Sequence, residues 1–182
     1  MLESIVFQHD TKFILNQIVR SLFHDTWTHC TIITEPYTKL TSDLKILNAE
    51  PTGVVIDTMK VIAPAYCTFE VWSPVGISSN TVKDAVDKSI LNLKGKQYGY
   101  FQIMGYLWFL FARNFNKNAV NPLIDGVWCS EVVDVFLGYC GIDAVKDRGK
   151  DEVRPQELYN YVSTCGLFEK TYVKLLGESL AS

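Results

Sequence analysis

The sequence predicts an α+β domain in which an antiparallel meander of about four to five strands packs against helices. Two observations carry this prediction. Between residues 28 and 72, short runs rich in β-branched residues are separated by turn residues, which is typical of consecutive antiparallel strands. From residue 79 onwards, apolar residues recur at helical spacing. A chain of 182 residues can bury roughly two-thirds of its unfolded surface in one core, so residues 1–182 are expected to form a single domain.

The strand signals are strongest in the first half of the chain. The first expected strand, Thr28 to Thr34, is rich in β-branched residues and ends before Glu-Pro-Tyr, which favours a turn. A Pro-Thr-Gly sequence at residues 51–53 supplies a hairpin turn between the second strand and the third. The remaining strands are expected at residues 45–48, 53–57 and 66–72.

Helix signals flank these strands. Each expected helix combines apolar residues at helical spacing with a residue that favours a helix start or end. The expected helices are one capped by Asp10 that carries Phe13, Ile14, Ile18 and Leu22, one capped by Ser79 or Asn80 and ended by Gly95, the apolar segment Tyr100 to Ala112, one from Cys129 to near Gly141, and one over residues 156–164 between Pro155 and Gly166. A short amphipathic tail is expected to close the chain.

Composition and charge argue against several classes of protein. The formal net charge is −3 and no run of Lys or Arg is longer than a pair, so nucleic acid is not an expected partner. The five cysteines form an odd set without a C-x-x-C pair, which favours neither a disulfide framework nor a thiolate zinc site. A reducing compartment is the simplest interpretation.

The chain shows no targeting or membrane-spanning signal. Its first residues lack a basic region followed by a long apolar run, so no signal peptide is expected. The apolar segment Tyr100 to Ala112 is shorter than the roughly 20 residues that a spanning helix needs. If the protein contacted a membrane, this segment would make the contact, but no membrane contact is expected. The predicted location is cytoplasmic or virion-associated.

Cys129 is the candidate nucleophile. It is expected at the first turn of a helix, where partial positive charge and free N–H groups lower a thiol pKa and favour the reactive thiolate. The alternative is a structural role, because Cys129 also belongs to an apolar stripe with Val132, Val133 and Phe136.

His29 is the candidate base for this thiolate. Of the three histidines, His9 and His24 fall in loop or helix-end contexts, whereas His29 lies in a strand that can hold an imidazole rigidly. A lone histidine in a strand can equally be structural. Asn48 and Glu50 lie two residues apart near the end of the next strand, so they would share a face, and either could orient the imidazole. Both can also be ordinary turn residues.

A metal site is the weaker interpretation of the residues around His29. His24, Asp25, His29 and Cys30 include types that bind metals, but adjacent residues of a strand point to opposite faces and cannot all converge on one ion. No metal and no cofactor are therefore expected.

The order of these features resembles a known family. A strand His and a strand polar residue come first, then Gly-Lys-Gln-Tyr at residues 95–98, and then Trp-Cys-Ser-Glu-Val-Val at residues 128–133 opening a helix. The sequence is similar here to the circularly permuted papain-like hydrolases of the NlpC type, and more distantly to lecithin:retinol acyltransferase. Residues 153–158 are similar to the family's closing element, so the resemblance spans roughly residues 25 to 165.

The resemblance implies a site. It makes Cys129 the nucleophile and His29 the base, and it favours Asn48 over Glu50 as the third member. It also suggests that Tyr98 helps to hold the reacting carbonyl, together with the Cys129 backbone N–H.

The expected function is that of a cysteine peptidase or amidase, which cleaves an amide-type bond through a thioester. The expected partners are a peptide, peptidoglycan or an acyl-containing substrate. The alternatives are a lipid-directed acyl hydrolase or transferase and a catalytically silent structural or binding module, for example in a virion. The sequence predicts no oligomeric state.

Overall fold

The fold is an α+β arrangement in which helices pack against an open antiparallel sheet. The computed structural model describes residues 2–10, 24–99, 126–145 and 153–180. Within them the strands are β1 (Ile5–Asp10), β2 (His29–Ile33), β3 (Lys45–Glu50), β4 (Gly53–Thr58), β5 (Cys67–Pro74) and β6 (Phe168–Lys174). The described helices are α2 (Met59–Ile62), α3 (Ser79–Leu93), α5 (Cys129–Tyr139) and α6 (Pro155–Thr164). The predicted α+β class is confirmed.

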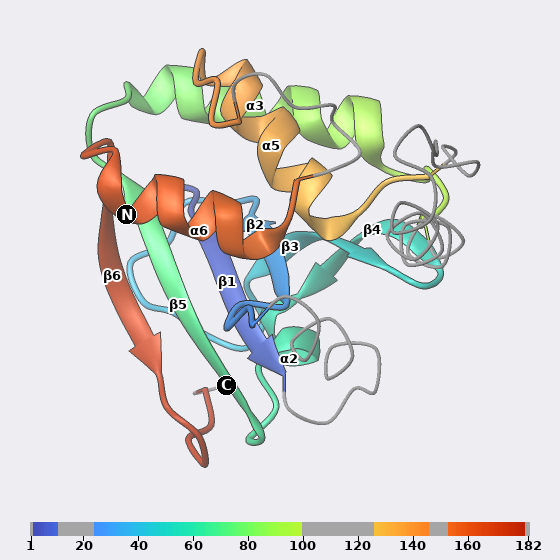
Figure 1. Ribbon diagram of the computed structural model, residues 1–182, viewed down its shortest axis with the longest axis vertical. Helices are drawn as coiled ribbons and strands as arrows, with labels where there is room; N and C mark the ends of the chain where they lie inside the picture. Colours follow the sequence, from blue (N-terminus) through green and yellow to red (C-terminus); the bar gives the residue numbers. More distant parts are fainter. Residues whose placement is uncertain (1, 11–23, 100–125, 146–152, 181–182) are drawn as a thin grey trace, which may run out of the picture.

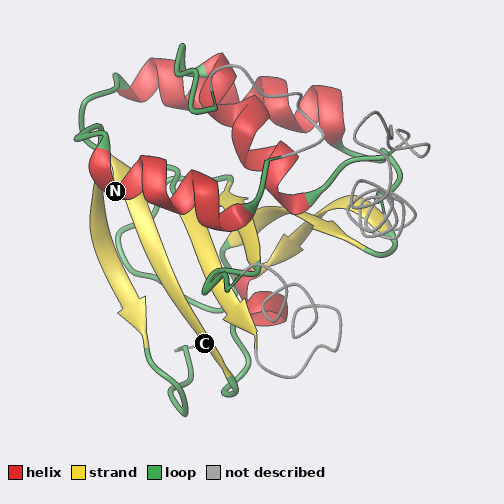
Figure 2. Cartoon of the chain, in the orientation of Figure 1, coloured by secondary structure: helices red, strands yellow, loops and turns green. Residues whose placement is uncertain are grey.

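The six strands lie in the order β4-β3-β2-β1-β5-β6, and every neighbouring pair is antiparallel. Helix α5 contacts β2 and β3, α6 contacts β6, and α3 packs on α5 (Figure 1). Figure 2 shows these three helices gathered on one side of the sheet. Among the described residues, no helix is both long enough and apolar enough to cross a membrane.

Several predicted elements need correction. The four predicted strands correspond to β2 to β5, but β1 was not predicted, and β6 stands where an amphipathic tail was predicted. The meander comprises β1, β2, β3 and β4, and the predicted strand β5 is not part of it, because β5 pairs with β1 instead of β4. Helix α3 is capped by Ser78, whose Oγ accepts a hydrogen bond from Thr81 N at 3.2 Å, and not by Ser79 or Asn80.

Asp10 ends β1, and the helix expected after it lies outside the described residues. The expected apolar helix Tyr100 to Ala112 also lies outside them.

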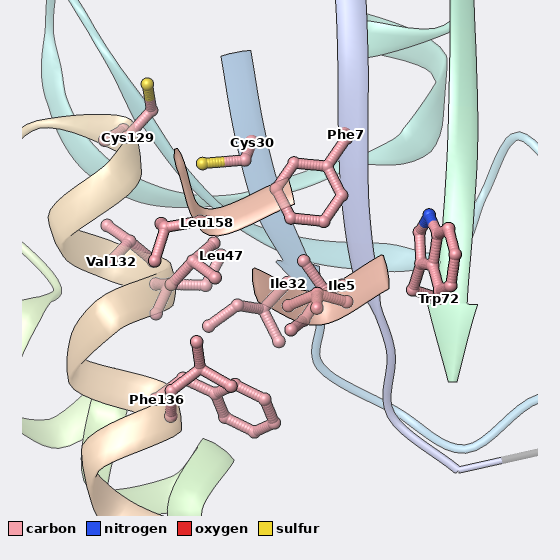
Figure 3. Packing of buried hydrophobic residues seen from close by; sticks show 14 of the residues in the cluster. Ile5, Phe7, Cys30, Ile32, Leu47, Trp72, Cys129, Val132, Phe136 and Leu158 are labelled. Atoms are coloured by element: carbon pink, nitrogen blue, oxygen red, sulfur yellow. The ribbon is translucent and has the colours of Figure 1, made fainter. Parts of the chain in front are cut away.

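The central strands of the sheet are buried on both faces. Towards α3, α5 and α6, side chains from the central strands meet the apolar stripe of α5 (Figure 3). Residues of this first core are Ile5, Phe7, Cys30, Ile32, Leu47, Val132, Val133 and Phe136. The opposite face forms a second core with α2, which includes Val6, Ile33, Ile46, Phe69, Met59 and Ile62. A central strand buried on both faces lacks the apolar–polar alternation that marks a half-exposed strand, which explains why β1 was missed.

Candidate active site

Cys129 is the first residue of α5 and is almost completely buried, with 7% of its surface exposed. The helix begins there because Trp128 has an extended backbone, while its carbonyl already accepts a bond from Val132 N at 3.2 Å. Ser130 fixes this first turn from the next position, since its Oγ donates to the carbonyl of Val153 at 2.6 Å. The Cys129 sulfur therefore lies beside the positive end of a helix, which favours a thiolate.

His29 is the first residue of β2 and lies where β2 and β3 separate. It pairs with Gln8 of β1, whereas β2 and β3 pair only at Ile32–Leu47 and Ile33–Ile46. Counting along the strands from this register places His29 and Asn48 on the same face of the sheet. Their side chains meet there, with His29 Nε2 and Asn48 Oδ1 2.8 Å apart.

This contact defines which imidazole nitrogen is available for chemistry. Asn48 is only 3% exposed, and its Oδ1 can only accept, so Nε2 carries the proton in this contact. The other nitrogen, Nδ1, is left to interact with Cys129, which hydrogen-bonds to the His29 side chain. His29 thus has an orienting partner on one side and a candidate nucleophile on the other.

Glu50, the alternative orienting residue, has a different partner. Its carboxylate accepts a hydrogen bond from Thr52 Oγ1 at 2.7 Å, and it pairs with Gly53 across the β3–β4 hairpin. The structure therefore brings Asn48 to His29 and leaves Glu50 with the turn.

The electrostatics of the site favour an ion pair. The hydrogen bond from Cys30 lowers the pKa of Cys129 well below its usual value, burial opposes this, and the charge and hydrogen bond of His29 lower it further. Burial lowers the pKa of His29, but the Cys129 charge and the hydrogen bonds to Cys129 and Asn48 outweigh it, so the pKa is raised. A thiolate and an imidazolium are therefore the favoured forms.

Cys30 is a member of the site that the sequence analysis did not identify as one. It follows His29 in β2, is fully buried, and hydrogen-bonds to Cys129 from the sheet side. Figure 3 shows its sulfur directed towards α5, close to the helix end that carries Cys129. Strand alternation was the available signal, because it places Cys30 on the face opposite to His29, together with Ile32 and the first core.

Tyr98 is placed by backbone contacts just upstream of Cys129. It forms a parallel bridge with Val127, whose N–H donates to the carbonyl of Gln97 at 3.0 Å. Gly126 permits this close approach, because a Cβ there would lie 2.4 Å from Gly99 Cα. Burial, followed by the charges of Cys129 and Cys30, raises the pKa of Tyr98. Its hydroxyl thus keeps its proton and can act as a donor near Cys129.

A second support holds the segment that leads into His29. Arg154 binds both carboxylate oxygens of Asp25, at 3.1 and 3.0 Å. Gln156 Oε1 accepts hydrogen bonds from the backbone N–H groups of Thr26 and Trp27, at 2.9 and 3.1 Å. The start of α6 therefore fixes residues 25–27.

The residues considered for a metal site have other surroundings. Asp25 binds Arg154, His24 is exposed, and His29 and Cys30 both contact Cys129. In the part of the chain that the structure describes, no three His, Cys, Asp or Glu side chains are grouped so that they could hold a metal ion.

No protein-family model matches the chain, and no curated protein sequence matches it. The arrangement of Cys129, His29 and Asn48 must therefore be interpreted from its own chemistry. A buried thiolate at a helix start, an imidazole on one side of it and an amide behind the imidazole can together carry out acyl transfer.

Proposed function

We propose that the protein is a cysteine hydrolase of the circularly permuted papain-like, NlpC type, with Cys129 as nucleophile and His29 as base. The observation that carries the proposal is the position of His29 between Asn48 Oδ1, 2.8 Å from Nε2, and the Cys129 side chain at the start of α5. Support for the permuted type comes from chain order, because the strands with His29 and Asn48 precede the helix with Cys129.

The mechanism follows from these contacts. The Cys129 thiolate attacks the carbonyl carbon of an amide, and the C=O electrons move to oxygen to form a tetrahedral oxyanion. The Cys129 backbone N–H and the Tyr98 hydroxyl are the proposed donors to this oxyanion. The His29 imidazolium gives its Nδ1 proton to the leaving nitrogen, the C–N bond breaks, and an acyl thioester remains on Cys129.

Hydrolysis of the thioester regenerates the site. Neutral His29 takes a proton from a water molecule, and the resulting hydroxide attacks the thioester carbonyl. The C–S bond then breaks, which releases a carboxylic acid product and restores the thiolate. Asn48 keeps the His29 ring aligned throughout without taking a proton itself. The proposed substrates contain an amide-type bond, as in a peptide or in peptidoglycan.

Alkylation across pH tests the proposal without knowledge of the substrate. The protein is treated with iodoacetamide between about pH 4 and pH 9, and the label on each cysteine is quantified by peptide mass spectrometry. We expect Cys129 to react at a pH well below the usual thiol range, and its rate to fall in His29→Ala. Buried Cys67 serves as an internal control because it lies on β5, which β1 separates from the strand that carries His29.

Acyl transfer is tested with p-nitrophenyl acetate. We expect one acetyl group on Cys129, a burst of nitrophenolate, and loss of both in His29→Ala. A folded protein in which Cys129 reacts no faster than Cys67 and takes up no acetyl group contradicts the proposal and favours a structural or binding module. Turnover of detergent-dispersed esters without turnover of peptides would instead identify a lipid-directed enzyme.

A further inference from the structure

We propose that Cys30 is a positioning residue of this site, whose thiol donates a hydrogen bond to the Cys129 thiolate and holds the sulfur in its anionic form. The inference rests on the proposed function in one respect, namely that Cys129 is the nucleophile. It adds a residue that acts through Cys129 and does not contact the substrate.

The geometry begins with the register of β2. Cys30 pairs with Phe7 and Ile32 pairs with Ile5, and all four side chains belong to the first core. This face of the sheet packs against α5. Cys30 is fully buried, Cys129 is 7% exposed, and the Cys30 sulfur is directed to the helix end that carries Cys129 (Figure 3). Cys30 and Cys129 therefore belong to one buried cluster, with the Cys30 thiol on the side of the sheet that faces the start of α5.

The direction of the hydrogen bond follows from the charge states. Burial raises the pKa of Cys30 well above its usual value, and the neighbouring Cys129 raises it further, whereas the pKa of Cys129 is lowered. Cys30 thus remains a thiol over the whole range in which Cys129 ionises. Its single S–H has an anionic sulfur as its acceptor, and a hydrogen bond to a charged group is stronger than one between neutral groups.

Among the residues that the structure describes, three titratable side chains act on Cys129 from the elements around it. His29 supplies a positive charge and a hydrogen bond, Cys30 supplies an S–H donor, and Tyr98 contributes a hydroxyl that stays protonated. Of these three, Cys30 is the one that lies on the packed face between β2 and α5. It therefore limits the movement of the Cys129 side chain as well as stabilising its charge.

The test compares three variants by the alkylation pH profile of Cys129. Cys30→Val keeps a small apolar side chain and removes the donor, Cys30→Ser keeps a donor, and Cys67→Val removes another buried cysteine of the same sheet as a control. We expect Cys30→Val to raise the alkylation midpoint of Cys129 by about one pH unit, which corresponds to the loss of one hydrogen bond to a charged group. The midpoint should not rise in Cys30→Ser or in Cys67→Val. Circular dichroism and thermal melts establish that each variant is folded.

The outcomes separate this inference from the proposed function. An unchanged midpoint in folded Cys30→Val overturns the role of Cys30, even if the unmodified protein hydrolyses amides. Equal rises in Cys30→Val and Cys30→Ser also overturn it, because packing rather than the donor would then be responsible. A low midpoint that depends on the Cys30 donor supports it even if no substrate is turned over, since the readout is the thiolate and not catalysis.

Discussion

Asn48→Ala is the substitution that tests the geometry of the site most directly. Asn48 accepts the Nε2 hydrogen bond of His29 at 2.8 Å in a position that is 3% exposed. A hydrogen bond to a charged group contributes about 1.5 to 3 kcal/mol, and about 1.4 kcal/mol corresponds to a tenfold change in rate. We therefore expect acyl transfer to Cys129 to slow by about 10- to 100-fold, less than on loss of Cys129 or His29.

The pH profile of Asn48→Ala has a defined sign. The Asn48 hydrogen bond is one of the causes that raise the pKa of His29, so its removal lowers that pKa. The ion pair exists between the pKa of Cys129 and the pKa of His29, so the alkaline limb of the profile should move to lower pH. Iodoacetate is negatively charged and its rate should depend on the imidazolium, whereas neutral iodoacetamide reports mainly the thiolate. The shift should therefore appear with iodoacetate and be small with iodoacetamide.

Glu50→Gln is the matched control for this experiment. Glu50 lies two residues further along β3, but its carboxylate is bound by Thr52. We expect its rates and both limbs of its profile to equal those of the unmodified protein. The reasoning is refuted if folded Asn48→Ala keeps the original alkaline limb, or if Glu50→Gln moves that limb more than Asn48→Ala does.

Three further predictions follow from other contacts. Cys129→Ala should lower the pKa of His29, seen by NMR titration of the imidazole, because burial then acts without the opposing thiolate. Arg154→Met should reduce the free energy of unfolding at neutral pH by about 2 kcal/mol, since it leaves the buried Asp25 carboxylate unpaired. Burial already raises the pKa of Asp25, so this loss should shrink in urea titrations at acid pH, where Asp25 is protonated. Gly53→Ala should cost about 1 to 3 kcal/mol in the same titrations, because its φ is 125° and a Cβ would lie 2.8 Å from a carbonyl oxygen.

Each of these predictions has a matched control. Cys140→Ala should leave the His29 titration unchanged. Lys170→Met, which breaks a more exposed pair with Glu70, should cost less than about 1 kcal/mol. Gly95→Ala should cost less than the Gly53 substitution, because φ is 84° but no atom lies within 4 Å of its Cβ position. If a control substitution changes the measured quantity as much as its test substitution does, the structural explanation given for that test substitution is contradicted.

The parts of the fold that the sequence predicted correctly depend on local patterns. The helix start at Cys129 follows from apolar spacing within α5, and the β3–β4 hairpin follows from the turn residues between two β-branched runs. Strand β1 was not predicted, because Ile5 to Gln8 are all buried and the segment therefore lacks the alternation of apolar and polar residues that marks a half-exposed strand. Strand β6 was not predicted, because most of its residues are at least partly exposed and several are polar, so the segment has no strong strand pattern.

In the candidate site, too, some residues could be predicted from local patterns, whereas the contacts that depend on tertiary packing could not. His29 and Asn48 could be chosen from residue type and strand position, and the resemblance favoured Asn48 over Glu50. The pairing of Asp25 with Arg154 could not be predicted, because the two residues are 129 positions apart and meet only when the start of α6 packs against the segment that precedes β2. The hydrogen bond of Cys30 to Cys129 likewise requires the packing of α5 on β2. Contacts of this kind depend on the tertiary structure and leave no periodic signal in the chain.

The separation of β2 and β3 explains how one strand can act on Cys129 from two sides. Adjacent residues of a strand point to opposite faces, so His29 and Cys30 could not both contact a group placed over the middle of the sheet. Yet Cys129 contacts both side chains. His29 is the first residue of β2, beyond the last pair with β3, and the start of α5 lies near this strand end (Figure 3). The strand end therefore lets the imidazole reach the sulfur from one face while the Cys30 thiol reaches it from the other. The β2–β3 ladder stops at Ile32–Leu47, so His29 lies at an open strand end, and we attribute the site to this position.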